Sequence, residues 1–260
     1  MRQSKLEKQV DLIPKTIKWC KKCIISNQRP RIIFDKDGVC SGCRNNELKQ
    51  EINWKEREKE LEELLNRYRS KDGNYDVIVP SSGGKDSGYV AHQLKYKYNM
   101  NPLTVTWSPL EYTNIGLQNL QSKIDCGFNN ILFRPNTLFQ KKLARLCLEE
   151  LGDAFHVFVL GQVSYPFHIA LKMNIKLVFY GENGELEYAG DPKHIDKPYK
   201  PVSEWLEHYF KGSDLNELIK FGLKEKDYLS KDDFSNSDLV FYKPPSEEKL
   251  LESGIKGQYF

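Results

Sequence analysis

Short apolar runs alternate with amphipathic stretches between Tyr75 and Tyr180, and this alternation limits the fold more than any other feature of the chain. The apolar runs predict strands, and the stretches between them carry apolar residues at helical spacing. The strands are expected at 75–80, 103–107, 130–134 and 176–180, and the helices at 87–98, 114–126, 138–151 and 162–173. This order predicts an α/β domain in which helices cover both faces of a parallel sheet.

The first predicted strand runs into a glycine-rich turn within 80-PSSGGKDS-87. The turn fits neither the G-x-x-x-x-G-K-[ST] pattern of the common phosphate loop nor the G-x-G-x-x-G pattern of dinucleotide folds. Adjacent glycines nevertheless let backbone N–H groups turn inward, and the following helix offers its positive N-terminus to an anion. We therefore expect a nucleotide with Mg²⁺ held by Asp86, since a bare carboxylate would repel phosphate. The alternative is a turn in which Ser81 or Ser82 and Asp86 only cap the helix.

A second polar segment, 181-GENGELEYAG-190, follows the last predicted strand. Ligands of parallel sheets collect at the carboxyl ends of the strands, so we expect this segment near the glycine-rich turn. Its carboxylates would ligate metal or orient an amine nucleophile, and a solvated acidic turn is the alternative. The carboxylates are those of Glu182, Glu185 and Glu187.

Four cysteines in the first fifty residues are spaced as two C-x₂-C pairs. The spacing predicts a closed, structural zinc site, with an iron–sulfur cluster as the alternative. The ligands would be Cys20, Cys23, Cys40 and Cys43. The remaining cysteines, Cys126 and Cys147, fall in predicted helices, where a free cysteine packs as a small apolar residue.

Changes in composition along the chain predict four parts. These are a zinc-binding module at 1–50, a connecting helix within 51–74, a nucleotide-binding α/β core at 75–183 and a substrate- or partner-binding region at 184–260. In the last part, short helices are expected at 202–211, around 214–221 and within 244–254. The net charge of +3 is too small to indicate a polyanionic partner.

The longest stretch without Asp, Glu, Lys or Arg is Ala154–Leu171. Two histidines and Pro166 within it favour a buried strand, a turn and a helix over a membrane span. The N-terminal residues carry charges throughout and show no apolar secretory signal. We therefore expect a cytoplasmic protein, in which thiols stay reduced and paired cysteines bind metal.

The run from Ser82 to Ser87 resembles the pyrophosphatase loop of the ATP pyrophosphatase superfamily, whose fold is the adenine nucleotide alpha-hydrolase-like fold. A longer resemblance, carried by 20–43, 116–136 and 161–183, is to the bacterial N-acetyl sugar amidotransferase family of O-antigen and flagellin-glycan biosynthesis. It covers nearly the whole chain, and members of the family continue beyond the position of Phe260. The resemblance implies that ATP adenylylates the acetamido oxygen of a nucleotide-linked sugar. Ammonia then displaces AMP to give an acetamidino sugar.

The resemblance also implies roles for individual residues. Pyrophosphate would be bound by Ser82, Gly83, Gly84 and Ser87. Candidate catalytic residues are Lys85, Asp86 as the Mg²⁺ ligand, Glu182 and Glu187. The nucleotide would further contact Trp107, Gly181 and Glu182, with core packing as the alternative for the tryptophan. We expect Tyr165 and His168 to pack in the core rather than face substrate.

A separate glutamine amidotransferase is the expected source of ammonia. The chain starts Met1-Arg2 instead of with a nucleophilic cysteine, and neither Cys126 nor Cys147 sits in a glycine-flanked nucleophile elbow. The other expected partner is the N-acetylated sugar; we expect neither nucleic acid nor membrane insertion. One alternative is a tRNA thiolase of the same superfamily, which would need paired reactive cysteines or an iron–sulfur cluster. Another is a zinc-ribbon protein that binds nucleotide or RNA without turnover.

Overall fold

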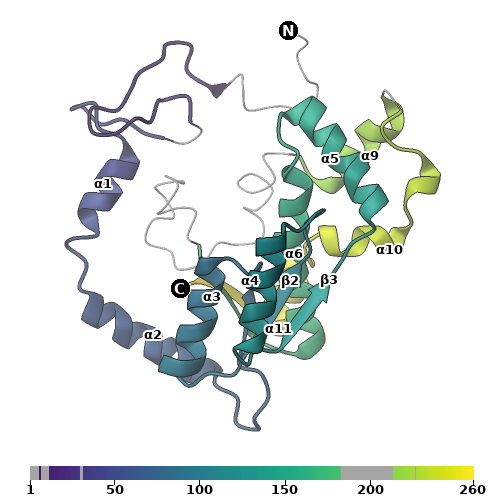
Figure 1. Cartoon of the computed structure of the whole chain (residues 1–260). Coiled ribbons are helices and arrows are strands. Elements are labelled where there is room, and N and C mark those ends of the chain that lie inside the picture. Colours follow the sequence, from purple (N-terminus) through teal and green to yellow (C-terminus); the bar gives the residue numbers. More distant parts are fainter. Residues whose placement is uncertain (1–5, 7–11, 30–31, 183–212, 226) are drawn as a thin grey trace. The chain divides into compact units, whose positions relative to one another are not determined.

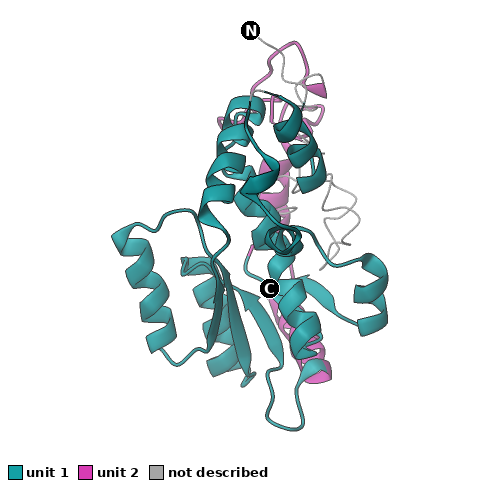
Figure 2. Cartoon of the chain, turned by 90° about the vertical axis from the view of Figure 1, so that its right-hand side faces the viewer, with its two compact units in different colours: residues 1–7, 68–181, 199–260 teal, residues 8–67, 182–198 magenta. Residues whose placement is uncertain are grey.

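The computed structural model describes Leu6 and residues 12–29, 32–182, 213–225 and 227–260. The chain divides into two compact units, which Figure 2 shows in different colours. The first unit comprises residues 1–7, 68–181 and 199–260, and the second comprises residues 8–67 and 182–198. All strands of the sheet belong to the first unit, so the α/β fold is a property of that unit alone.

The described residues of the first unit form a sheet of five parallel strands in the order β3-β2-β1-β4-β5. Figure 1 labels β2 and β3, which lie side by side. The strands are β1 (Val77–Pro80), β2 (Pro102–Trp107), β3 (Asn130–Phe133), β4 (Leu177–Tyr180) and β5 (Lys256–Tyr259). Ile78 of β1 lies between Leu103 of β2 and Val178 of β4. Side chains are buried on both faces of these central strands, so β1 and β4 are nearly continuous apolar runs, whereas β2 also buries Thr104 and Thr106.

Helices cover both faces of the sheet, which confirms the predicted fold class. α6 packs against β1, β2 and β4, whereas α3 packs against β1 and β4. The crossovers from β1 to β2 and from β3 to β4 run in opposite directions along the sheet. Because such crossovers are right-handed, they place α3 and α6 on opposite faces. The helical elements are α3 (Lys85–His92), its π-helical continuation η2 (Gln93–Lys97), α4 (Asn114–Asp125), α5 (Thr137–Leu151), α6 (His156–Met173), α9 (Leu215–Lys224), η5 (Lys231–Asp233), α10 (Asn236–Leu239), η6 (Val240–Tyr242) and α11 (Glu247–Ser253).

The second unit contains the cysteine pairs, followed by helices α1 (Ser41–Leu48) and α2 (Trp54–Tyr68). Cys40 caps α1, because its Sγ accepts a hydrogen bond from the backbone N–H of Cys43 at 3.4 Å. α2 corresponds to the helix expected within 51–74. The second cysteine pair therefore lies at the junction between the cysteine-containing loops and the first helix.

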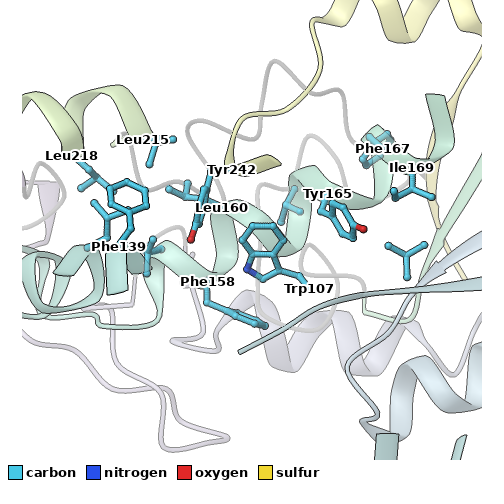
Figure 3. Packing of buried hydrophobic residues seen from close by; sticks show 14 of the residues in the cluster. Trp107, Phe139, Phe158, Leu160, Tyr165, Phe167, Ile169, Leu215, Leu218 and Tyr242 are labelled. Atoms are coloured by element: carbon cyan, nitrogen blue, oxygen red, sulfur yellow. The ribbon is translucent and has the colours of Figure 1, made fainter. Parts of the chain in front are cut away.

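The core of the first unit is built around α6 and the end of β2. Figure 3 shows Trp107 lying among buried aromatic side chains. Its ring centroid is 4.9 Å from that of Tyr242, 5.3 Å from that of Phe133 and 5.8 Å from that of Tyr165. A Cβ atom added at Gly161 of α6 would lie 2.0 Å from the indole ring. The glycine therefore allows the indole to lie directly on the helix.

The structure corrects the prediction for Ala154–Leu171. The sequence favours a strand, a turn and a helix, but nearly the whole stretch belongs to α6, with Pro166 inside the helix. Most of its side chains are buried, and apolar periodicity cannot separate a helix that is buried on all sides from a strand. None of the helices among the described residues has both the length and the apolar character needed to cross a bilayer.

Residues beyond the expected boundary at 183/184 also belong to the sheet unit. β5 pairs with β4, and the helices expected around 214–221 and within 244–254 are α9 and α11. The sequence does not predict β5, because Lys256-Gly257-Gln258-Tyr259 lacks an apolar run. The helix expected at 202–211 lies outside the described residues.

We expect Gly161→Ala to lower the free energy of unfolding by about 1 to 3 kcal/mol, because the added methyl group would overlap the indole ring. Urea unfolding followed by tryptophan fluorescence measures this change. Gly88→Ala in α3 is the matched control, since a Cβ atom there meets nothing within 4 Å. The control should leave stability unchanged or raise it, because alanine favours a helix over glycine. Equal stability of the two variants would contradict the described packing.

Candidate functional site

The order of the strands reverses beside β1, and this reversal marks the candidate site. From β1 the chain continues to β2 and β3 on one side, while β4 and β5 lie on the other side. Ligands of open parallel sheets bind at the carboxyl ends of the strands that flank such a switch point. The glycine-rich turn at 81–84 follows β1, and Gly181 follows β4. Both segments therefore lie at the edge where a ligand is expected.

Two glycines allow close approaches around the turn. Gly83 has a φ of +88°, and a Cβ atom there would lie 2.9 Å from the backbone of Leu120 in α4. A Cβ atom at Gly181 would lie 3.0 Å from the carbonyl carbon of Asp86 in the first turn of α3. Glycine at these positions lets α4 and the end of β4 close tightly around the turn.

The turn leads into α3 without a side-chain cap from the described residues. Gly84 occupies the N-cap position in an extended conformation. Ser82 Oγ accepts a hydrogen bond from the N–H of Gly84 at 3.3 Å, and Ser87 Oγ donates to the carbonyl of Gly84 at 3.3 Å. Of the capping alternative, the bond from Ser82 to the N-cap residue is present, whereas the N-cap residue itself supplies no side-chain hydrogen bond. An uncapped helix start behind a glycine turn presents backbone N–H donors to an anion.

Lys85 and Asp86 lie side by side in the first turn of α3. Lys85 Nζ pairs with Asp86 Oδ1 on the exposed side of the helix. A single carboxylate beside a phosphate site suits Mg²⁺, which usually binds through one or two carboxylates together with phosphate oxygens. The donor set at Asp86 therefore fits the predicted cation.

A buried lysine lies beneath the turn. Lys123 of α4 is 8% exposed, and its Nζ donates a hydrogen bond to Ser81 Oγ. Ser81 Oγ in turn donates to Ser87 Oγ at 3.1 Å, and the carbonyl of Ser81 accepts from Thr106 Oγ1 at 2.6 Å. Burial lowers the pKa of Lys123 to about 8. The sequence holds only a weak signal for this residue: Lys123 follows Leu120 by three positions and so shares its helix face.

The other predicted nucleotide contacts lie in different surroundings. Trp107 is 4% exposed and belongs to the core, so its position corresponds to the packing alternative (Figure 3). Glu182 directly follows Gly181 in the chain and is exposed. Glu185 and Glu187 lie outside the described residues, so their predicted roles stay predictions.

Core packing is confirmed for Tyr165 and Cys147, whereas His168 is half-buried at the edge of the core. Tyr165 and Cys147 are buried, and His168 Nε2 lies 2.8 Å from the carbonyl oxygen of Lys243. Burial also lowers the pKa of His168.

The prediction that Cys126 packs in the core is wrong, because its side chain is exposed. α4 ends at Asp125, so Cys126 stands at the C-cap. Gly127 follows with a φ of +88° and turns the chain at this point. Cys126 thus belongs to the helix end rather than to its buried face.

The four predicted zinc ligands come together in the second unit. The Sγ atoms of Cys20, Cys23, Cys40 and Cys43 all lie within 4.8 Å of one another. The sulfur atoms of Cys20 and Cys43 are 4.0 Å apart, and those of Cys23 and Cys40 are 3.6 Å apart. Tetrahedral zinc with Zn–S bonds near 2.3 Å requires a sulfur–sulfur distance of about 3.8 Å. The four-cysteine group therefore fits zinc binding.

Backbone donors surround one of these sulfur atoms. Cys20 Sγ accepts hydrogen bonds from the N–H groups of Lys22 and Cys40, both at 3.3 Å. Burial raises the pKa of Cys20, but backbone N–H donors outweigh it and the pKa falls to about 6. Burial and the neighbouring sulfur atoms raise the pKa of Cys40 and Cys43 in the absence of a cation. A thiolate is the form that ligates metal. Arg44 pairs with Asp35 and so connects the loop between the cysteine pairs to α1.

No protein-family model matches the chain. A segment of 87 residues is 34% identical to part of an uncharacterized protein of Methanocaldococcus jannaschii, covering 33% of this chain and 31% of that protein. The match thus spans about a third of the relative's length, and the relative's name carries no activity.

We expect the purified chain to retain zinc through dialysis and Cys40→Ser to lose it, because three thiolates leave the tetrahedral shell open. Elemental analysis by mass spectrometry measures the metal. Cys126→Ser is the matched control, since it removes an exposed thiol outside the four-cysteine group. Iron with a visible charge-transfer band, or equal zinc in both variants, would contradict the assignment.

The pKa of Lys123 predicts a pH dependence of stability. The folded pKa is about 8 against an ordinary value near 10.5, so between these values the unfolded chain binds more protons than the folded one. Stability therefore gains on the order of 2 to 3 kcal/mol from Lys123 as pH rises through this window. Lys123→Met should lack the gain, whereas Lys176→Met, which removes a half-buried lysine, should keep it. Urea unfolding at several pH values measures the difference between the variants, and parallel curves would refute it.

Proposed function

We propose that this chain is an ATP-dependent amidotransferase that converts an acetamido group of an N-acetylated, nucleotide-linked sugar into an acetamidino group. The observation that carries the proposal is the uncapped glycine-rich turn at 81–84, which lies at the switch point of the sheet. Its geometry supports phosphate binding. The order of residues from Ser82 to Ser87 supports cleavage of ATP to AMP and pyrophosphate. The resemblance to sugar amidotransferases supports the choice of substrate.

The first step activates an oxygen that is otherwise a poor leaving group. The acetamido oxygen attacks the α-phosphorus of ATP and forms an O–P bond, while the bond to the bridging oxygen breaks and pyrophosphate leaves. Backbone N–H groups and hydroxyls of the turn bind the leaving pyrophosphate. These come from Ser82, Gly83, Gly84 and Ser87. Asp86 holds Mg²⁺, which supplies charge neutralisation when bound, and Lys85 is a further cationic candidate.

The second step replaces the activated oxygen. Ammonia attacks the carbon of the adenylylated group, the C–O bond breaks and AMP leaves with the oxygen. The attacking nitrogen then loses a proton, and Glu182 and Glu187 are our candidates for accepting it. Neither step forms a covalent bond to the protein, so catalysis depends on positioning and charge stabilisation.

The proposal also includes the source of ammonia, the role of the zinc module and the cellular compartment. A separate glutamine amidotransferase supplies ammonia, the zinc module is structural, and the reaction takes place in the cytoplasm. The acetamidino sugar enters bacterial surface-glycan biosynthesis, as in O-antigen or flagellin glycans.

Incubation of diacetamido nucleotide sugars with the chain, ATP, Mg²⁺ and ammonium tests the proposal. Mass spectrometry should show the replacement of one oxygen by NH, with equal amounts of AMP and pyrophosphate. Asp86→Asn should lower kcat/KM by about 100-fold or more, because it weakens charge stabilisation at the phosphates. Asp72→Asn is the matched control, since Asp72 lies in an exposed turn after α2. Accumulation of ADP and orthophosphate would contradict the proposal.

Two further measurements separate this activity from its alternatives. Glutamine in place of ammonium should give no product with the chain alone, because the glutaminase is a separate protein. Activity should also survive Cys126→Ser and Cys147→Ser, whereas a thiolase that used these cysteines would lose it. RNA binding with a steep salt dependence and no ATP cleavage would favour the zinc-ribbon binding protein.

A further inference from the structure

We propose that Lys123 binds the phosphate chain of the nucleotide from beneath the glycine-rich turn and neutralises the leaving pyrophosphate. The inference rests on the proposed function, because it requires ATP at 81–84. Lys123 belongs to α4 and stands 36 positions after the last residue of the Ser82–Ser87 run. It would give the site a buried cation in addition to the exposed Lys85.

A chain of hydrogen bonds joins the ammonium group to the turn. Lys123 Nζ donates to Ser81 Oγ, Ser81 Oγ donates to Ser87 Oγ, and Ser87 Oγ donates to the carbonyl of Gly84. Ser81 directly follows β1, and Ser87 lies in the first turn of α3. The ammonium group is thus two hydrogen bonds away from a hydroxyl that we place at the pyrophosphate.

The helix that carries Lys123 is held against the turn. Leu120 lies one helical turn before Lys123, and its backbone would be 2.9 Å from a Cβ atom added at Gly83. The turn and α4 therefore cannot separate without losing this contact. The packing of the α4 backbone against Gly83 therefore holds Lys123 beside the turn, in addition to the hydrogen bond made by its side chain.

The charge of Lys123 has no counterion among the described residues that accounts for its burial. Its bond to Ser81 is to a neutral hydroxyl, and desolvation alone shifts its pKa. The acidic residues of α3 and α4 have other bonds: Asp86 pairs with Lys85, and Asp125 accepts a hydrogen bond from Gln121. A buried ammonium without an anionic partner is unfavourable, so a phosphate in the turn would remove a penalty that the free protein bears.

Binding of the α,β-methylene analogue of ATP, which cannot be cleaved at the reacting bond, tests the inference. Isothermal titration calorimetry with Mg²⁺ should show about 10- to 100-fold weaker binding for Lys123→Met, because a charge-assisted phosphate contact is lost. Lys176→Met removes the same charge just before the start of β4 and should bind as the wild type does. Equal affinity of Lys123→Met and the wild type would overturn the inference.

A measurement on the wild type covers the case in which Lys123→Met does not fold. A phosphate contact raises the pKa of Lys123, so the wild type should take up protons on binding the analogue just above about pH 8. Titrations in buffers of different ionisation enthalpy measure this uptake. Lys123→Arg keeps the charge but stays protonated, so it should show less uptake. The same uptake in both proteins would overturn the inference.

The outcomes distinguish this inference from the proposed function. The role of Lys123 alone is refuted if the wild type cleaves ATP to AMP, Lys123→Met binds the analogue with unchanged affinity, and the wild type and Lys123→Arg take up the same number of protons. Both the proposed function and the role of Lys123 are refuted if the wild type neither binds the analogue nor releases AMP. Weaker binding by Lys123→Met together with proton uptake by the wild type supports both.

Discussion

The handedness of the crossovers on either side of β1 is the constraint on which the rest of the structure depends. Since parallel crossovers are right-handed, reversing direction along the sheet sends α3 and α6 to opposite faces. The carboxyl ends of β1 and β4 then lie side by side, because the two strands pair in parallel. Every group that we place at the candidate site in this unit enters from that edge or from α4 beside it. The strand order thus creates the ligand-binding edge, and the side chains at that edge determine which ligand it binds.

Close backbone packing converts this edge into a shaped site. Gly83 and Gly181 let α4 and β4 approach the turn to distances that a side chain would prevent. The same packing buries the ammonium group of Lys123. A loosely held turn would let water solvate that charge and would leave the backbone N–H groups unaligned. The site therefore combines donors from the backbone with a cation whose exposure is limited by the fold.

The sequence predicts the parts of this molecule whose signals are local. The alternation between 75 and 180 indicates the sheet and its helices, and the C-x₂-C pairs indicate a four-cysteine group, because spacing alone determines which atoms can meet. β5 is missed because Lys256-Gly257-Gln258-Tyr259 becomes a strand only by pairing with β4. Lys123 is missed because a lysine on a helix normally faces solvent, and only the tertiary position of α4 buries it. Trp107 remains ambiguous in sequence, since its location depends on the absence of a side chain at Gly161.

The pairing of β5 with β4 has a consequence for how the molecule assembles. The two strands are adjacent in the sheet although a long stretch of chain, from Tyr180 to Lys256, separates them in sequence. Closing such a long connection costs conformational entropy. The cost is smaller for the pairings of β1 with β2 and of β2 with β3, because their connections are shorter. During synthesis, β4 leaves the ribosome long before β5 does, so the edge of β4 that pairs with β5 stays unpaired in the meantime. That interval would expose an unpaired strand to other nascent chains, so we expect chaperone binding to concentrate there.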